Sequence, residues 1–162
     1  MIKQYPNEEL IYPLNIDPRK LNHQVILITG GTGSFGKQMT HTLLTNFKPK
    51  KIIIYSRDEY KQSLIKKDLT KEQMKLMRFF IGDVRDLKRL EQAMNNVDYV
   101  IHAAALKHVP IVEYNPFEAI KTNVLGSQNV IDACLKENVE VAVCIGTDKA
   151  VSPLNTYGAT KH

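Results

Sequence analysis

The stretch Val25-Ile-Leu-Ile-Thr-Gly-Gly-Thr-Gly-Ser-Phe-Gly36 carries the strongest fold signal in this chain of 162 residues. Its first half is an apolar run that predicts a strand over 25–29. Glycines then follow at positions 30, 33 and 36, where a chain can turn sharply and bring backbone N–H groups close to a pyrophosphate. A helix that begins near Ser34 points its positive end at the same place.

Strand, glycine turn and helix in this order predict the phosphate cradle of a dinucleotide-binding fold. Its cofactor contacts are expected at Gly30, Thr32, Gly33, Ser34, Phe35 and Gly36. A glycine-rich turn without a ligand is the alternative. A second motif overlaps, because Gly31-x-x-x-x-Gly36-Lys37 resembles a P-loop for nucleoside triphosphates. Gln38 stands where that loop needs Ser or Thr to hold Mg²⁺, which disfavours the P-loop interpretation.

Apolar runs and helical patterns alternate along the rest of the chain. Further strands are predicted over 51–56, 77–81, 98–103 and 139–145, and further helices over 58–69, 87–94 and 116–137. Such alternation predicts an α/β fold whose parallel sheet is covered by helices on both faces. Right-handed crossovers favour the doubly wound, Rossmann-like topology with strand order 3-2-1-4-5. Ligands are then expected at the carboxyl ends of the strands.

Two of the predicted helices have a recognisable apolar face. In the first, this face is marked by Phe35, Met39, Leu43 and Leu44. In the helix over 116–137, the predicted buried face comprises Phe117, Ile120, Val124, Ile131 and Leu135. Asn115 and Glu118 are expected to form a capping box at the start of that helix, with Pro116 in its first position.

Composition limits the domain count and the location of the protein. Residues 1–21 contain three prolines and show no period, so an arm is expected before a single dinucleotide-binding domain over 22–162. The absence of a secretory signal and of a run of about 18 apolar residues predicts a cytoplasmic protein without a membrane span. Cys134 and Cys144 lie in apolar patterns without metal or redox spacing, so we expect reduced, buried cysteines and no metal site.

The net charge of +5 does not by itself predict nucleic-acid binding. The lysines are scattered among acidic residues on predicted helices, and no set of stacking aromatic residues accompanies them. A basic excess instead suits anionic small ligands such as dinucleotides and nucleotide sugars.

The end of the second predicted strand bears on the choice of cofactor. Folds that bind NAD place an acidic residue here, on the ribose hydroxyls. This chain has Ser56 and Arg57 instead, and Lys61 follows one helical turn later. A hydroxyl and two cations suit a 2′-phosphate, which favours NADP over NAD. In the alternative, Arg57 and Lys61 are solvated surface charges and Asp58 is a helix cap.

Further cofactor contacts are expected after the third and fourth strands. Asp83 and Val84 would flank an adenine ring, and a plain turn is the alternative. After the fourth strand, contacts are expected at Ala103, Ala104, Ala105 and Lys107. Lys107 suits a phosphate or a sugar hydroxyl, with an exposed surface lysine as the alternative, and His102 is expected to be a core histidine.

The reacting end is predicted after the fifth strand. Tyr157 and Lys161 lie four residues apart, so on a helix they share one face. A nearby ammonium favours the phenolate, which lets Tyr157 accept a hydroxyl proton while hydride leaves for the cofactor. Asp148 and Lys149 would place an acid and a base within reach of one substrate, and a salt-bridged turn is the alternative.

These motifs resemble the extended short-chain dehydrogenase/reductases. The resemblance rests on Thr29-Gly-Gly-Thr-Gly-Ser-Phe-Gly36, Tyr55-Ser-Arg-Asp-Glu59, Phe80-Ile-Gly-Asp-Val-Arg-Asp86, His102-Ala-Ala-Ala-Leu-Lys-His-Val-Pro110, Lys121-Thr-Asn-Val-Leu-Gly126, and Thr147-Asp-Lys-Ala150 with Tyr157-Gly-Ala-Thr-Lys161. More narrowly, residues 25–162 are similar to the inverting UDP-N-acetylglucosamine 4,6-dehydratases of bacterial pseudaminic-acid and surface-glycan synthesis.

The resemblance implies a reaction and assigns roles in it. Tyr157, supported by Lys161 and Thr147, would deprotonate the C4 hydroxyl of a UDP-sugar while hydride passes to NADP. Lys149 would then remove the acidified C5 hydrogen, Asp148 would protonate the departing C6 hydroxyl, and hydride would return to C6.

The resemblance also implies substrate contacts and an assembly. Lys107, Asn123 and Thr147 would contact the substrate, and Asn123 would order the active site through its amide. The full-length form is expected to be a homo-oligomer.

The chain departs from the family pattern in two places. Gly146 stands where the family usually has Ser before Thr-Asp-Lys, which removes one hydroxyl near the nicotinamide or the substrate. The family places a sixth strand and a substrate domain after this point, so residues 22–162 are expected to be the front part of an enzyme, with little turnover alone. A UDP-sugar C4 or C5 epimerase is the nearest rival, and a non-catalytic dinucleotide-binding or assembly module is the second.

Overall fold

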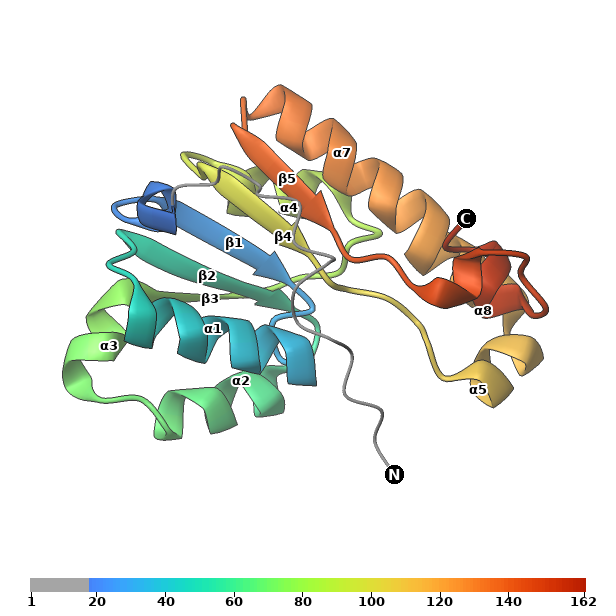
Figure 1. The fold of residues 1–162 in the computed structure, drawn as a ribbon, viewed down its shortest axis with the longest axis horizontal. Coiled ribbons are helices and arrows are strands. Elements are labelled where there is room, and N and C mark those ends of the chain that lie inside the picture. Colours follow the sequence, from blue (N-terminus) through green and yellow to red (C-terminus); the bar gives the residue numbers. More distant parts are fainter. Residues whose placement is uncertain (1–17) are drawn as a thin grey trace, which may run out of the picture.

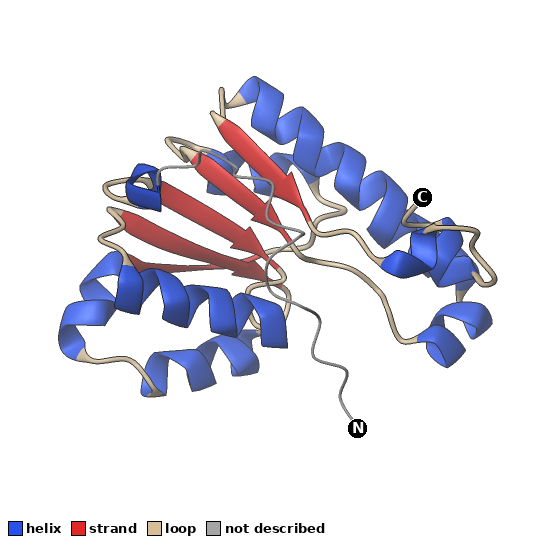
Figure 2. Cartoon of the chain, viewed as in Figure 1, coloured by secondary structure: helices blue, strands red, loops and turns tan. Residues whose placement is uncertain are grey.

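Five parallel strands form the centre of the fold (Figures 1 and 2). They are β1 (Val25–Thr29), β2 (Lys51–Ser56), β3 (Met77–Ile81), β4 (Tyr99–His102) and β5 (Val141–Cys144). Their order in the sheet is β3-β2-β1-β4-β5, which confirms the predicted topology. Because all neighbouring strands are parallel, the loops that follow them meet at one edge of the sheet.

The computed structural model describes residues 18–162. Most of the predicted arm over 1–21 therefore lies outside the described residues. Its last four residues, Pro18–Leu21, form a short 3-10 helix, η1.

Two apolar layers follow from the alternation of side chains along each strand. Ile26 and Ile28 of β1 pack on one face of the sheet with Leu43 of helix α1 (Ser34–Asn46). Leu27, between them, packs on the opposite face with Leu90 of α4 (Leu87–Met94). Each such side chain, once fully buried, contributes about 2 kcal/mol through the area it removes from water.

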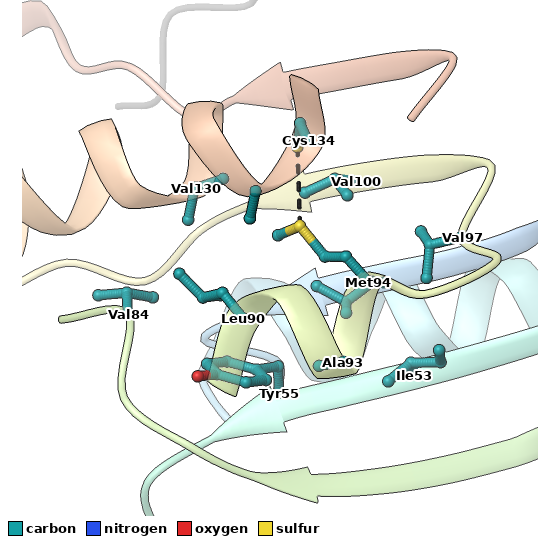
Figure 3. Close-up of a cluster of buried hydrophobic side chains, with 12 residues drawn as sticks. Ile53, Tyr55, Val84, Leu90, Ala93, Met94, Val97, Val100, Val130 and Cys134 are labelled. Carbon is teal, nitrogen blue, oxygen red and sulfur yellow. Dashed lines mark hydrogen bonds between the residues drawn. The ribbon is translucent and has the colours of Figure 1, made fainter. Parts of the chain in front are cut away.

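Helices α4 and α7 (Gly126–Lys136) close the second layer (Figure 3). There Val130 and Cys134 of α7 face Leu90 and Met94 of α4, and the thiol of Cys134 lies 3.8 Å from the sulfur of Met94. Burial raises the pKa of the Cys134 thiol to about 11, so this cysteine stays protonated, as expected of a core residue.

Helices α1 and α2 (Glu59–Lys67) cover the other face (Figure 1). The predicted helix over 58–69 is confirmed as α2, with Asp58 as its N-cap. Two helices escaped prediction, α3 (Lys71–Leu76) and α5 (Val109–Tyr114), because six residues are too few to show a helical period.

The predicted single helix over 116–137 is wrong in its continuity. It consists of α6 (Pro116–Ala119), the π-helical segment η2 (Ile120–Leu125) and α7. The predicted cap is wrong as well, since the Asn115 amide donates to the Ile111 carbonyl and Glu118 pairs with Arg85 and Lys121. A π-helical turn shifts the residues that follow it around the axis, so one period cannot describe the whole segment.

The predicted buried face of that segment is also wrong. Phe117, Ile120, Val124, Ile131 and Leu135 are all exposed. The side that packs inward carries smaller side chains instead, namely Ala119, Thr122, Asn123, Gly126, Val130, Ala133 and Cys134. Small residues let α7 approach α4 and the sheet closely, and Gly126 faces the Val84 side chain so tightly that an added Cβ would lie 2.7 Å from it.

Two further residues predicted to be buried, Cys144 and Phe35, are exposed. Cys144 is exposed, because β5 is hydrogen-bonded to β4 alone within the described residues. Phe35, predicted to face the core of the first helix, is 44% exposed and lines the cavity described next. The strands predicted over 98–103 and 139–145 are real but shorter, at Tyr99–His102 and Val141–Cys144.

Candidate functional site

A cavity of about 310 Å³ lies at the carboxyl ends of β1 to β4. Its lining includes all the contacts predicted for the phosphate cradle, namely Gly30, Thr32, Gly33, Ser34, Phe35 and Gly36. It also includes the predicted contacts after the next three strands, namely Ser56, Arg57, Lys61, Asp83, Val84, Ala103, Ala104, Ala105 and Lys107. Tyr157, Lys161, Thr147, Asp148 and Lys149 do not line it.

The cradle depends on one left-handed residue. Gly30 has φ of +66°, a conformation that residues with a side chain rarely adopt. A Cβ there would lie 2.8 Å from the Ala104 nitrogen, so only glycine lets the loops after β1 and β4 touch. The turn then leads into α1, where Gly33 is the N-cap and no side chain caps the helix. The first N–H groups of α1 are thus directed at the cavity, as binding of a diphosphate requires.

Arg57 is held at the cavity by an acidic neighbour. The Asp83 carboxylate lies 3.7 Å from the Arg57 guanidinium and also receives two hydrogen bonds from the Arg85 guanidinium. Burial opposes ionisation of Asp83, but these bonds and charges lower its pKa, so it stays an anion. The Arg85 guanidinium also forms an ion pair with the Glu118 carboxylate at 2.8 Å, and this pair links the loop after β3 to α6.

Ser56 and Lys61 are engaged by neighbours as well. The Gln62 amide donates to the Ser56 hydroxyl oxygen at 3.0 Å, which leaves the hydroxyl hydrogen free to bond a ligand. The Lys61 ammonium lies 3.4 Å from the Asp58 carboxylate, which also caps α2 by accepting from the Lys61 backbone N–H. Asp58 is therefore a helix cap, as the alternative interpretation held, while Arg57 and Lys61 still face the cavity.

A buried histidine joins the cradle to the other face of the sheet. His102 is 2% exposed; its Nδ1 lies 2.7 Å from the Thr29 hydroxyl and its Nε2 lies 3.0 Å from the Ser127 hydroxyl. The Thr29 hydroxyl also accepts from the backbone N–H groups of Ala103 and Ala104. Burial, with the charge of Lys161 adding, lowers the pKa of His102 to about 4, so the ring is neutral. This confirms a core histidine.

Asn123 connects the loop after β4 to the segment that carries Tyr157. Its side-chain oxygen accepts from the Leu106 N–H at 2.8 Å, and its NH₂ donates to the Leu106 carbonyl and to the Thr160 hydroxyl. Thr160 in turn donates to the Tyr157 carbonyl at 2.9 Å. Asn123 is 3% exposed, and its amide bonds groups of the protein itself, the Leu106 backbone and the Thr160 hydroxyl.

Tyr157 lies on the short helix α8 (Thr156–Ala159), beyond the carboxyl ends of the strands (Figure 1). It packs on Val112 of α5 and Ala119 of α6. Tyr157 and Lys161 do not share one helix here, because α8 ends at Ala159 with Thr160 as its C-cap. Lys161 is half-buried, and burial lowers its pKa.

Asp148 and Lys149, predicted as an acid and a base, lie on a 3-10 turn against α8. This turn, η3 (Asp148–Ala150), follows Thr147, whose hydroxyl accepts from the Lys149 N–H and bonds the Asp148 carboxylate at 3.1 Å. The Lys149 carbonyl presses on Gly158 so closely that a Cβ at Gly158 would overlap it. Asp148 and Lys149 are exposed, and they form no ion pair with each other among the described residues, which argues against the salt-bridged turn.

Four lining residues escaped prediction: Tyr55, Asp58, Gly82 and Thr122. Thr122 differs from the others because its hydroxyl is buried and has no hydrogen-bond partner. It precedes Asn123 in the motif Lys121-Thr-Asn, so that motif carried the available signal, although only its asparagine was singled out.

Two other kinds of site have no counterpart in residues 18–162. No three or more His, Cys, Asp or Glu side chains gather there to hold a metal ion. None of the helices over the same range combines the length and apolar character needed to cross a bilayer.

Comparison with known proteins bears on the chemistry of the site. Residues 26–162 match the model of a family described as polysaccharide biosynthesis protein. The inverting UDP-N-acetylglucosamine 4,6-dehydratase of Campylobacter jejuni is 61% identical over 140 residues, which make up 86% of this chain and 41% of that relative. A UDP-glucose 4-epimerase of Rickettsia canadensis is 47% identical over 141 residues, with 85% and 40% covered.

A solved structure agrees with the sequence relatives. Pen from Bacillus thuringiensis has a TM-score of 0.84 and 44% sequence identity, and the match covers 87% of this chain and 44% of that one. The chain thus spans about two fifths of the length of the curated relatives it matches.

Proposed function

Because this chain belongs to the polysaccharide biosynthesis protein family, whose model matches residues 26–162, we propose that it is the nucleotide-binding part of a C5-inverting UDP-N-acetylglucosamine 4,6-dehydratase. The 61% identity with the Campylobacter jejuni dehydratase carries this proposal. The cavity supports it, since the glycine turn and three strand ends converge there. The product would serve bacterial surface-glycan synthesis, pseudaminic-acid synthesis in particular.

We propose NADP as the cofactor. The cavity residues fit its adenosine half, because helix α1 presents uncapped N–H groups to a diphosphate and Arg57 stands where a 2′-phosphate would bind. β2 ends at Ser56 rather than at an acidic residue, and the Asp58 carboxylate, which also lines the cavity, is engaged as the cap of α2. Asp83 contributes by holding the guanidinium of Arg57 in place.

Replacing Arg57 tests this choice of cofactor. Arg57→Ala should weaken NADP binding about tenfold and leave NAD binding nearly unchanged, as calorimetric titration of the 162-residue chain would show. Arg85→Ala is the matched control, because Arg85 also pairs with Asp83 but does not line the cavity. Equal affinities of the unmodified chain for NADP and NAD would contradict the assignment.

The reacting end follows from the residues around α8. Tyr157 would take the proton from the sugar C4 hydroxyl, with the Lys161 ammonium and the Thr147 hydroxyl stabilising the phenolate. When bound, the nicotinamide would supply the hydride acceptor and donor. Lys149 would remove the C5 proton and Asp148 would protonate the leaving C6 hydroxyl. The exposure of both side chains on η3 leaves them free to reach a sugar.

We propose that Lys107 and Thr147 contact the substrate. Asn123 receives a different role, because its amide is already occupied by Leu106 and Thr160. It would act as a positioning residue that fixes the loop after β4 relative to Tyr157.

A chimera tests the activity, because the chain covers only part of its relatives. Residues 25–162 would replace the matching region of the Campylobacter jejuni dehydratase, and conversion of UDP-N-acetylglucosamine would be followed together with deuterium exchange at C5. We expect turnover in the chimera and a loss of about 10²–10⁴-fold in Lys149→Ala, with C5 exchange abolished. Lys136→Ala, a lysine paired with Glu91 on α4, is the control.

The runner-up function is a UDP-sugar epimerase, favoured by the 47% identity with the Rickettsia canadensis enzyme. Simple C4 epimerisation needs no base at C5, so the Asp148–Lys149 pair favours dehydration. A chimera that interconverts C4 epimers without losing water would establish the rival. A chimera that binds cofactor but converts no sugar would favour the non-catalytic module instead.

We also propose a homo-oligomer for the whole protein. The support is the outer apolar stripe, defined as Phe117, Ile120, Val124, Ile131 and Leu135, which α6, η2 and α7 expose. Large apolar side chains exposed on neighbouring turns are typical of an interaction site.

A further inference from the structure

Gln62 is a buried polar residue on helix α2, next to the cavity at the strand ends but outside its lining. It is 3% exposed and shares the inward face of α2 with Ile65. An apolar side chain is usual on such a face, because an amide removed from water needs hydrogen-bond partners. The partners of Gln62 lie at the ends of β2 and β3, beside the cavity.

The oxygen atoms around Gln62 fix the direction in which its amide points. The NH₂ nitrogen lies 2.9 Å from the Phe80 carbonyl oxygen, 3.0 Å from the Ser56 hydroxyl oxygen and 3.3 Å from the Ser56 carbonyl oxygen. A carbonyl can only accept, so the Phe80 carbonyl requires the NH₂ group, and not the amide oxygen, on this side. The second hydrogen of that group is then directed at Ser56.

This orientation decides the role of the Ser56 hydroxyl. A hydroxyl has one hydrogen and two lone pairs, and here the Gln62 amide occupies a lone pair. The hydroxyl hydrogen therefore points away from Gln62, and Ser56 lines the cavity. A phosphate dianion presents only acceptors, whereas a ribose hydroxyl both donates and accepts. A serine hydroxyl that is held as a donor is matched to the phosphate.

The charges around Ser56 favour the same kind of ligand. The Arg57 guanidinium, which lies 3.7 Å from the Asp83 carboxylate, belongs to the next residue, and Arg57 lines the cavity. Lys61, the residue before Gln62 on α2, lines the cavity as well. Helix α2 thus supplies a cation to the cavity and, one residue later, the amide that orients the Ser56 hydroxyl.

We propose that Gln62 is a positioning residue that increases the preference for a 2′-phosphate by holding the Ser56 hydroxyl as a hydrogen-bond donor. Gln62 itself does not contact the cofactor. This inference rests on the proposed binding of NADP and assigns part of its selectivity to a side chain outside the cavity. Because Gln62 acts through Ser56, its removal should matter only while the Ser56 hydroxyl is present.

Two adenosine phosphates that differ by the 2′-phosphate alone test the role of Gln62. Calorimetry would give the ratio of the affinities of the 162-residue chain for adenosine 2′,5′-bisphosphate and for 5′-AMP. We expect the unmodified chain to prefer the bisphosphate. Gln62→Met, which keeps the length of the side chain but not the amide, should reduce that preference about three- to tenfold and leave the affinity for 5′-AMP nearly unchanged. Gln73→Met is the matched control, since the Gln73 amide caps α3 and does not line this cavity.

A double-mutant cycle distinguishes a positioning role from a structural one. Ser56→Ala should lower the preference for the bisphosphate by itself, and Gln62→Met added to Ser56→Ala should lower it no further. Gln62→Asn, whose amide is one methylene shorter and does not reach Ser56, should lose as much preference as Gln62→Met. It takes the place of Gln62→Met in the cycle if the methionine variant does not fold.

The possible results separate this inference from the proposed function. An unchanged preference in the Gln62 variants would overturn the role of Gln62 and leave the proposed binding of NADP intact. Equal losses from Gln62→Met with and without the Ser56 hydroxyl would show that Gln62 does not act through Ser56, which also overturns the inference. An unmodified chain that binds the bisphosphate and 5′-AMP equally would overturn the proposed cofactor together with this inference.

Discussion

His102 shows how a single residue ties the site to the core. Its two ring nitrogens bond the Thr29 hydroxyl at the end of β1 and the Ser127 hydroxyl at the start of α7. The Ser127 hydroxyl in turn donates a hydrogen bond to the Asn123 carbonyl at 2.6 Å. A protonated ring would carry a charge where water cannot reach it, which is why the pKa of His102 is lowered to about 4.

This lowered pKa makes stability depend on pH. An unfolded chain takes up a proton on His102 near pH 6.5, whereas the folded chain resists protonation until about pH 4. The free energy of unfolding should therefore fall as pH drops from 6.5 to 4, and this group should account for about 3 kcal/mol. Above pH 6.5 the group contributes no pH dependence.

Urea unfolding at neutral and at acidic pH measures the effect. His102→Gln should lose markedly less stability on acidification than the unmodified chain, whatever its stability at neutral pH. His108→Gln, at an exposed position, should keep the full pH dependence. Identical acid losses in the unmodified chain and in His102→Gln would contradict the assigned cause.

At the scale of elements, the proposed reacting end consists of α5, η3 and α8. The Glu113 carboxylate of α5 accepts from the Thr156 N–H at 2.6 Å, and Asn155 caps α8 by accepting from the Gly158 N–H. The Lys149 carbonyl of η3 rests on Gly158. These contacts fix Asp148 and Lys149 relative to Tyr157.

Gly158→Ala should therefore destabilise the chain, although alanine normally favours a helix by about 1 kcal/mol over glycine. The added Cβ overlaps the Lys149 carbonyl, and displacing backbone costs about 1–3 kcal/mol. Gly146→Ala is the control, because its Cβ would meet nothing within 4 Å. Urea unfolding would compare the two variants. An unfolding free energy of Gly158→Ala at or above that of the unmodified chain would refute the close contact.

At the scale of the whole molecule, residues 18–162 expose several large apolar side chains. The outer apolar stripe follows α6, η2 and α7, and Phe117 and Leu135 within it are each 74% exposed. Val141 and Val143 of β5 are exposed beside α7, on the strand that ends the described sheet (Figure 1). Water contact with this much apolar surface is unfavourable, which favours association.

We expect the chain to self-associate through the outer apolar stripe. Sedimentation velocity across a concentration series should show oligomers, and the double variant Val124→Lys with Leu135→Lys should shift the equilibrium to monomer, since buried ammonium groups are costly. Tyr60→Lys, at a similarly exposed position on α2, should not. A chain that stays monomeric throughout the series would contradict the prediction.

Strand order and the position of the cavity at the strand ends could be predicted from the sequence. A strand buried on both faces appears as a continuous apolar run, and the right-handed crossover rule leaves few ways to connect five such runs. The strand ends must then meet at one edge, so Gly33, Arg57 and Ala104 could be placed together although they lie far apart in the chain.

By itself, therefore, the sequence determined the sheet, its order and the edge at which the cavity lies, because these depend on local period and chain connection. Tertiary structure alone decided which side of residues 116–137 is buried, because close approach to α4 selects small side chains over the large apolar ones. It also decided that the Thr122 hydroxyl has no partner, since a π-helical turn depends on packing that no local pattern encodes.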